Sequence, residues 1–320
     1  MPDDSVEDTV DPEGSQPVDL SEQVPPEVIN LPSGSDLTPE AGGRIAAACL
    51  TRLVLLAGEA ESGKTTLLAT IYEKFNEGDF ADLVFAGSAT LVGWEKRCHL
   101  ARVASGAEKA DTERTLGLQQ RLLHLRVRDK SLAEPPQDLL LTDLSGEAFK
   151  LIKDSTDECQ KLGMLKRADH FVLLVDGRKL AARGARHEAQ NNGMALLRSC
   201  VDAGMVGSNS FVDVVFSKYD LLAPVDRDTS EFLKHIVDTI KRRFERRLGR
   251  LRFHNVAARP KSGTIEYAFG IPDLLRSWTE DSPYFVSRLS LPVQLPLRAS
   301  MFDSYLRVRF PDFAEIRSWK

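Results

Sequence analysis

Short apolar runs alternate along this chain with longer stretches whose apolar side chains recur every three or four residues. The runs lie at residues 53–57, 82–86, 122–127, 139–141, 171–175, 211–216 and 251–257. The stretches with helical spacing lie at residues 67–75, 186–204, 230–248 and 271–278. This alternation is typical of a parallel sheet that helices cover on both faces. We therefore predict an α/β fold with a mostly parallel sheet.

The two ends of the chain differ from this pattern. Residues 1–43 contain many Asp, Glu, Pro and Ser and no Lys or Arg. Such a segment cannot bury enough apolar surface to offset its chain entropy, so we predict a disordered acidic tail. Residues 44–280 are predicted to form the α/β domain. Residues 281–320 carry apolar and aromatic side chains but no motif, and they form an extension of unknown role.

The first apolar run leads into a glycine-rich loop in the stretch LVLLAGEAESGKTT, residues 53–66. Gly58, Gly63, Lys64 and Thr65 match the pattern GxxxxGK[ST], between a strand and a helix start. Glycines let the backbone N–H groups face a phosphate, and the helix N-terminus favours negative charge. Lys64 is expected to bridge the β- and γ-phosphates, and the Thr65 hydroxyl to bind Mg²⁺. The alternative is a glycine-bearing strand–helix turn without a ligand.

A second phosphate motif follows the run at residues 139–141. This run ends at Asp143, where a P-loop nucleoside triphosphatase places an acidic residue on the Mg²⁺ side. Asp143 and Gly146 also match DxxG, in which the glycine N–H senses the γ-phosphate. Glu147 comes next. Its carboxylate could accept a hydrogen bond from the attacking water in a catalytic role, or it could simply be an acid at a helix start.

The stretch between the two phosphate motifs is the expected place of a switch threonine that binds Mg²⁺. Thr115 is the preferred candidate because it shortly precedes the next strand, and Thr90 and Thr112 are alternatives. Each could equally be a surface threonine. Three arginines could bring positive charge to the phosphates or could be solvated: Arg97, Arg102 and Arg114.

The run at residues 211–216 ends in SKYD, a version of [NT]KxD with serine in the first place. The Asp220 carboxylate can accept hydrogen bonds from guanine N1–H and N2–H, which adenine does not offer. Lys218 can lay its stem across the base. Serine at 217 lacks the amide of the usual asparagine, which could soften the preference. AAR at residues 257–259 loosely resembles the SAK turn of GTPases, in which a backbone N–H reads guanine O6, and this resemblance implies that role for Ala258. The alternative is a strand followed by a polar turn.

Composition narrows the class of protein. The 320-residue chain is 42% hydrophobic and 28% charged, with a net charge of −5, which is typical of globular proteins and gives no general case for nucleic-acid binding. The scattered cysteines form no CxxC pair, which favours free thiols in the cytoplasm. Arginines and lysines at residues 241–247 form a basic helix face that is either solvated or binds an acidic partner. No apolar run is long enough to span a membrane.

The order of P-loop, DxxG, SKxD and AAR across residues 53–278 resembles a P-loop GTPase of the translation-factor-related class. The stretches SATLVGWEKRCHLAR and TDLSGE look like the bacterial double-GTPase family of conflict and defence operons, whose members are encoded beside a second GTPase-like partner. The resemblance implies GTP/GDP and Mg²⁺ as ligands. The residues implied at the phosphates, the metal and the base are Gly58, Ser62, Gly63, Lys64, Thr65, Thr66, Asp143, Gly146, Lys218, Asp220 and Ala258.

These motifs predict a GTP-dependent switch with slow intrinsic hydrolysis, in which Lys64 and Glu147 act on the phosphates and the water. Two alternatives remain open at this point. One is a P-loop ATPase, which the SKYD motif disfavours. The other is a nucleotide-dependent interaction module that binds GTP and barely hydrolyses it, which Glu147 and the acidic tail keep open.

Overall fold

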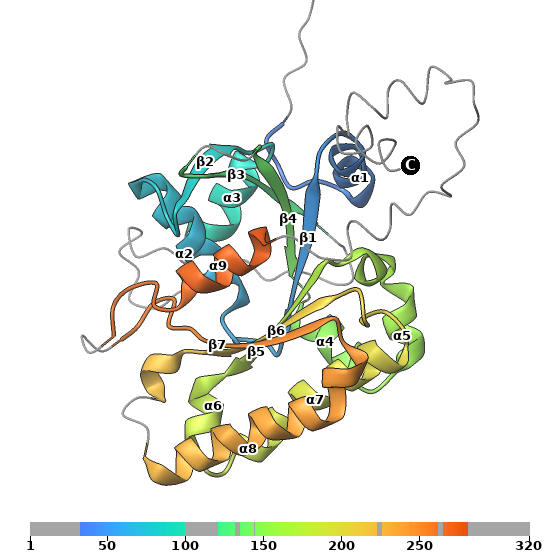
Figure 1. The fold of residues 1–320 in the computed structure, drawn as a ribbon, viewed down its shortest axis with the longest axis vertical. Helices are drawn as coiled ribbons and strands as arrows, with labels where there is room; N and C mark the ends of the chain where they lie inside the picture. Colours follow the sequence, from blue (N-terminus) through green and yellow to red (C-terminus); the bar gives the residue numbers. More distant parts are fainter. Residues whose placement is uncertain are drawn as a thin grey trace, which may run out of the picture. The chain divides into compact units, whose positions relative to one another are not determined.

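A seven-stranded sheet runs through the part of the chain that the structure describes. The structure is a computed structural model, and it describes residues 33–99, 121–131, 135–143, 145–222, 226–261 and 265–280. The strands are β1 (Thr51–Gly58), β2 (Leu83–Gly87), β3 (Leu123–Asp129), β4 (Gln137–Asp143), β5 (His170–Asp176), β6 (Phe211–Ser217) and β7 (Arg250–Asn255). Their order in the sheet is β2-β3-β4-β1-β5-β6-β7 (Figure 1).

Strand direction divides the sheet into two parts. The neighbours from β4 through β1, β5 and β6 to β7 are all parallel. The pairs β2–β3 and β3–β4 are antiparallel, so β3 alone runs against the others. The sheet is therefore mostly parallel, and the predicted fold class is confirmed.

Helices cover both faces of this sheet. They are α1 (Pro39–Ala48), α2 (Lys64–Glu77), α3 (Leu91–Cys98), α4 (Gly146–Ile152), α5 (Thr156–Lys161), α6 (Gly177–Ala181), α7 (Arg186–Asp202), α8 (Arg227–Phe244) and α9 (Ile271–Thr279). Short 3₁₀ turns lie at Gly163–Arg167, Tyr219–Leu221 and Glu245–Arg247. Figure 1 shows α2, α3 and α9 on one side of the sheet and α4 to α8 on the other.

The alternation of side chains along β1 explains why its sequence is apolar throughout. Leu55 and Ala57 join the core beneath α4, α5, α7 and α8. Val54 and Leu56 point the other way, into the core beneath α2, α3 and α9. Successive side chains of a strand face opposite sides of the sheet, so a strand covered on both faces has no polar face. Each fully buried leucine or valine contributes about 1.5–3 kcal/mol to the free energy of folding.

An apolar face and an N-terminal cap explain where the long helix α8 forms and begins. Phe232, Ile236, Ile240 and Phe244 recur every four residues and form its buried face. The Asp226 carboxylate accepts a hydrogen bond from the Thr229 backbone N–H at 2.6 Å and so caps the first turn. The sequence predicted a helix from 230 to about 248. The structure begins it three residues earlier because of this cap, and it ends at Phe244 before the turn Glu245–Arg247.

The start of the folded domain also differs from the prediction. Helix α1 begins at Pro39, and the Thr38 side chain caps it by accepting a hydrogen bond from the Ala41 N–H. Leu37 and Ile45 pack against Leu53, Leu122 and Leu140. The predicted boundary after residue 43 therefore falls inside α1, and the described helix begins before it. The rest of the predicted tail, residues 1–32, lies outside the described residues, as does the predicted extension 281–320.

The carboxyl ends of the parallel strands meet at one edge of the sheet. In register, Gly58 of β1 lies beside Leu174 of β5, and Asp176 at the end of β5 lies beside Ser217 at the end of β6. In open parallel sheets this edge is where ligands bind. The motifs that the sequence singled out therefore come together here.

Candidate functional site

The loop between β1 and α2 has the backbone that a phosphate site needs. A Cβ at Gly58 would lie 2.6 Å from the Ser62 hydroxyl oxygen and 2.7 Å from the Leu174 carbonyl oxygen, so only glycine fits there. Gly63 has φ 96° and ψ 14°, a left-handed conformation that favours glycine. Gly63 is also the N-cap of α2 and has no side chain to occupy the helix N–H groups. These groups remain directed at the loop.

Lys64 is folded across this loop. Its side chain is buried, and its Nζ donates hydrogen bonds to the Gly58 carbonyl oxygen at 2.8 Å and the Glu59 carbonyl oxygen at 2.9 Å. Thr65 and Thr66 are half-buried in the first turn of α2. Ser62 is fully buried, and its hydroxyl oxygen makes no hydrogen bond within the described structure. The predicted phosphate residues thus form one continuous cradle, while their contacts with a nucleotide remain predictions.

The second phosphate motif lies directly beside the first. β4 ends at Asp143, which pairs in register with Leu56, two residues before Gly58. Gly146 opens α4 against the phosphate loop, since a Cβ there would lie 2.8 Å from the Ala60 Cβ. The Ser145 hydroxyl accepts the Ala148 N–H at 3.0 Å and so shapes the start of this helix. The side chains of Asp143 and Glu147 lie outside what the structure describes.

The SKYD motif at residues 217–220 makes hydrogen bonds to the phosphate loop from β6. The Ser217 hydroxyl donates to the Ser62 carbonyl oxygen at 2.7 Å. Lys218 donates to the Glu61 carbonyl oxygen at 2.6 Å and to Asp176 Oδ2 at 3.0 Å. The backbone of Lys218 is left-handed, with φ 51°. Serine at 217 therefore braces the phosphate loop even though it lacks an amide.

Asp220 is positioned against the loop that follows β7. Its carboxylate is buried, and Oδ2 accepts a hydrogen bond from the Lys261 backbone N–H at 3.0 Å. Ala258 lies in the same loop, where its carbonyl oxygen accepts the Ala268 N–H at 3.3 Å. The two segments predicted to read the base are thus adjacent in space. Whether they read guanine remains a prediction.

Four charged residues at this site carry no role in the sequence prediction. Glu59 and Glu61 lie inside the phosphate loop, and each pairs with a cation of α6. Arg178 lies 3.1 Å from Glu61 Oε2, and its hydrogen bond and charge lower the pKa of the Glu61 carboxyl. Lys179 binds Glu59 Oε2. The stretch Asp176–Gly177, where β5 ends and α6 begins, could have indicated these partners, because the next two residues lie beside the loop.

The alternative switch threonine Thr90 and the candidate phosphate arginine Arg97 lie away from the phosphate loop. Thr90 is fully buried, and its hydroxyl oxygen accepts the His124 backbone N–H at 2.8 Å. Arg97 forms an ion pair with Asp36 at 2.7 Å. In this structure both residues make contacts around α3 rather than with the phosphate loop. Thr112, Thr115, Arg102 and Arg114 lie outside the described residues.

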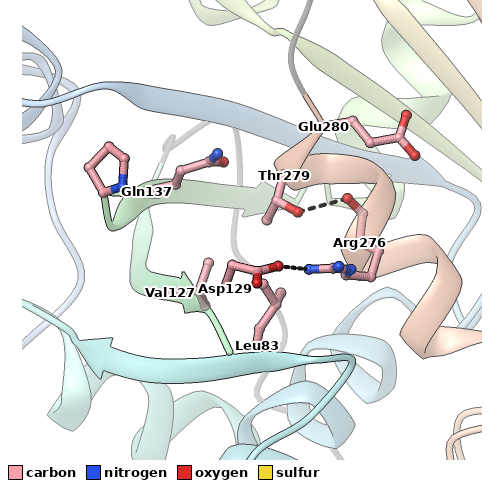
Figure 2. Close-up of a pocket in the computed structure, with 8 residues that line it drawn as sticks. Leu83, Val127, Asp129, Gln137, Arg276, Thr279 and Glu280 are labelled. Carbon is pink, nitrogen blue, oxygen red and sulfur yellow. Dashed lines mark hydrogen bonds and ion pairs between the residues drawn. The ribbon is translucent and has the colours of Figure 1, made fainter. Parts of the chain in front are cut away.

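A separate pocket of about 330 Å³ lies between β3, β4 and α9, near the opposite ends of the parallel strands (Figure 2). The Arg276 guanidinium crosses it to Asp129 at 2.6 Å. Hydrogen bonds from Ser131 and Arg276 hold the pKa of Asp129 well below its usual range. The described residues that line it include none from the phosphate loop or from residues 217–220. This pocket is therefore not part of the nucleotide site.

Comparison with known families now gives the chain its class. The model of a family described as Double-GTPase 2 matches residues 52–279. The chain belongs to this family. The Double-GTPase 2 match covers every motif described above and confirms the resemblance to P-loop GTPases of the double-GTPase class. Membership of a GTPase family places the chain among the guanine-nucleotide-binding proteins.

Solved structures show weaker similarity. The GTPase-like domain of Ski7 from S. cerevisiae, bound to GTP, is 13% identical with a TM-score of 0.43, and the match covers 75% of this chain and 53% of that one. The translation elongation factor SelB from Methanococcus maripaludis, in complex with the GTP analogue GPPNHP, is 13% identical with a TM-score of 0.37, over 72% of this chain and 34% of that one. The match thus spans about half of the Ski7 chain and about a third of the SelB chain. The curated proteins contain no match.

None of the helices in the described part of the chain combines the length and the apolar composition needed to cross a bilayer.

Proposed function

We propose that this protein is a GTP-dependent switch that hydrolyses GTP slowly and depends on Mg²⁺. One observation carries the proposal: Ser217 and Lys218 are bonded to the same loop that presents Lys64 and the α2 N-terminus. A site that reads the base is thereby held at a fixed distance from a site that binds phosphate. A strand–helix turn without a ligand would not need these hydrogen bonds to the SKYD motif.

The base is proposed to be guanine, read by Asp220. Its carboxylate is buried, and charged hydrogen bonds are stronger where water is excluded. The Lys261 N–H fixes one carboxylate oxygen and leaves further acceptor capacity on both oxygens, each of which has two lone pairs. The Ala258 N–H is proposed to read O6. Adenine has an amino group in place of O6, so it offers no acceptor to that N–H.

Hydrolysis is proposed to rest on positioning and charge. The α2 N–H groups and Lys64 are proposed to hold the phosphates, and the Gly146 N–H to donate a hydrogen bond to the γ-phosphate. Glu147 is proposed to orient the attacking water. A carboxylate near phosphate charge does this less well than an amide, which is the reason to expect a slow rate.

The donor set fits Mg²⁺, which prefers hydroxyl, carboxylate and water oxygens. Thr65 lies in the first turn of α2, and the register of β4 with β1 brings Asp143 beside the same loop. These two residues are proposed to hold the ion, with Thr115 as the switch ligand. When bound, the ion neutralises charge on the β- and γ-phosphates.

The biological setting follows from the family resemblance alone. We propose a cytoplasmic role in a bacterial conflict or regulatory system, with a second GTPase as protein partner. A pull-down of the two proteins in the presence of GDP or a GTP analogue tests this setting separately from the chemistry.

The direct test is the identity of nucleotide that copurifies with the protein. Nucleotide is released by denaturation and separated by chromatography, with Lys64→Ala prepared in parallel as the control. We expect GTP or GDP from the wild type and none from the variant, with both proteins melting cooperatively. ATP in the wild-type extract would contradict the proposal.

A further inference from the structure

Three polar side chains join the phosphate loop to the far end of α4. The Asn192 side-chain amide, on α7, donates a hydrogen bond to Glu59 Oε1 in the loop. Its carbonyl oxygen accepts from Lys153 Nζ at 2.9 Å, and Lys153 directly follows α4. We call Glu59, Asn192 and Lys153 the α4 bridge.

Glu59 is held on both oxygens rather than being a solvated acid. Oε1 receives the Asn192 amide and Oε2 the Lys179 ammonium. Its side chain is only 19% exposed. A carboxylate inside a loop that receives phosphate opposes the ligand's charge, so its orientation away from the loop's interior matters for binding. α6 and α7 together fix that orientation.

The other end of α4 touches the same loop. Gly146, its first residue, leaves no space for a Cβ beside Ala60, the residue after Glu59. At the far end, the Ser199 hydroxyl donates to the Lys153 carbonyl oxygen at 2.6 Å and fixes the Lys153 backbone on α7. The short helix is therefore tied to the phosphate loop at its start by packing and at its end through the bridge.

We infer that Asn192 is a positioning residue that keeps Gly146 in place for the γ-phosphate. This inference rests on the proposed function, because it assigns Gly146 to the third phosphate. Asn192 suits the role because an amide both donates and accepts, which lets it join a carboxylate to an ammonium. When the bridge is broken, the far end of α4 loses its tie to the loop. The affinity for a triphosphate then falls. The affinity for a diphosphate stays, because a diphosphate does not reach Gly146 and Lys179 still holds the Glu59 carboxylate on its other oxygen.

The test compares GDP with a non-hydrolysable GTP analogue on four variants at fixed Mg²⁺ and salt. Asn192→Leu and Lys153→Met each break the bridge, and a double variant combines them. Asn191→Leu is the matched control, since Asn191 is the exposed neighbour on the same helix. We expect each bridge variant to bind the analogue about fivefold or more weakly, the lower end of usual coupling between sites, with GDP affinity within about twofold. The double variant should be no weaker than the single ones, because both substitutions remove one connection.

Hydrogen exchange adds a readout that simple destabilisation would not move. In the wild type, amides of α4 should be more protected with the GTP analogue than with GDP, and the bridge variants should lose this difference. Equal weakening of both nucleotides, or additive effects in the double variant, would overturn the inference. If the wild type bound neither guanine nucleotide, the proposed function itself would fail, so the two failures are distinguishable.

Discussion

The Ser217 hydroxyl donates a hydrogen bond to the Ser62 carbonyl oxygen at 2.7 Å. The two residues are 155 positions apart in the sequence, and both are buried. This contact joins the loop proposed to bind the phosphates to the segment proposed to read the base. The same hydroxyl lies 3.2 Å from the Val175 carbonyl oxygen, so Ser217 also ties β6 to β5.

Removing this hydroxyl should weaken nucleotide binding. Ser217→Ala leaves the Ser62 carbonyl oxygen without this donor, and a neutral hydrogen bond contributes about 0.5–1.5 kcal/mol. We expect GTP affinity to fall about two- to tenfold, measured by titration with a fluorescent nucleotide. Ser208→Ala, at an exposed serine of the loop before β6, is the control. Unchanged affinity in Ser217→Ala would show that the contact does not support the site.

The metal assignment predicts a dependence on Mg²⁺ in two variants. Thr65→Ala and Asp143→Ala each remove a proposed oxygen ligand. Both should weaken GTP binding or turnover in Mg²⁺ buffer more than binding in EDTA. Lys74→Ala, at an ion pair with Glu77 farther along α2, should show no such dependence. Equal losses with and without EDTA would mean that neither residue binds the ion.

The stability of the fold should decrease as the pH falls below neutral. His170 is fully buried, and its burial lowers its pKa below the ordinary 6.5. The folded state therefore keeps it neutral, while the unfolded chain takes up a proton below about pH 6.5. Unfolding thus binds a proton, and stability falls with decreasing pH from about 6.5 toward the lowered folded value.

Asp213, which contacts His170, affects the stability of the fold at lower pH. Burial would raise the pKa of Asp213, but the nearby His170 and the hydrogen bonds from His254 and Arg252 outweigh it and hold the pKa well below the ordinary value. Its contribution is present above the pKa of the unfolded aspartate and is lost as the pH falls through the lower folded value.

Thermal melting between pH 7.5 and 5.5 checks the histidine. The wild type should lose stability over this range, by up to about 1.4 kcal/mol per pH unit for one proton, and His170→Gln should flatten the slope. His235→Gln, at an exposed histidine of α8, is the matched control. A wild-type curve with no slope between pH 6.5 and 5.5 would contradict a neutral, buried His170.

The sequence predicted those parts of the fold and site that depend on local pattern. The apolar runs became β1, β4, β5 and β6 because a strand buried on both faces leaves a continuous signal. Gly58 and Gly63 were identified by the GxxxxGK[ST] pattern, and the structure shows why glycine is needed there: a close contact at Gly58 and a left-handed backbone at Gly63. Such requirements involve single residues or their neighbours in the chain, so they can be predicted from the sequence.

The remaining features depend on contacts between distant segments. Thr90 was a reasonable switch candidate until the structure placed its hydroxyl against His124 of β3, 34 positions away. The pairing of Glu59 with Lys179 and Asn192 likewise spans more than 100 positions. Nothing in the local sequence of a loop tells which helix will supply its counter-charge. The start of α8 was misplaced for a smaller reason, because a cap at Asp226 extends the helix beyond its apolar pattern.

The measurement that tests the account most directly is base choice at Asp220. GTP, XTP and ATP compete against a fluorescent nucleotide on the wild type and on Asp220→Asn, at fixed Mg²⁺ and salt. Two charged hydrogen bonds of about 1.5–3 kcal/mol each predict a preference of several hundredfold or more for GTP over ATP in the wild type. The variant's amide matches xanthine, which offers a donor and an acceptor on that edge, so it should lose GTP affinity and gain XTP affinity with ATP still poor. Equal binding of ATP and GTP by the wild type, or unchanged GTP binding by the variant, would contradict the assignment of this protein as a guanine-nucleotide switch.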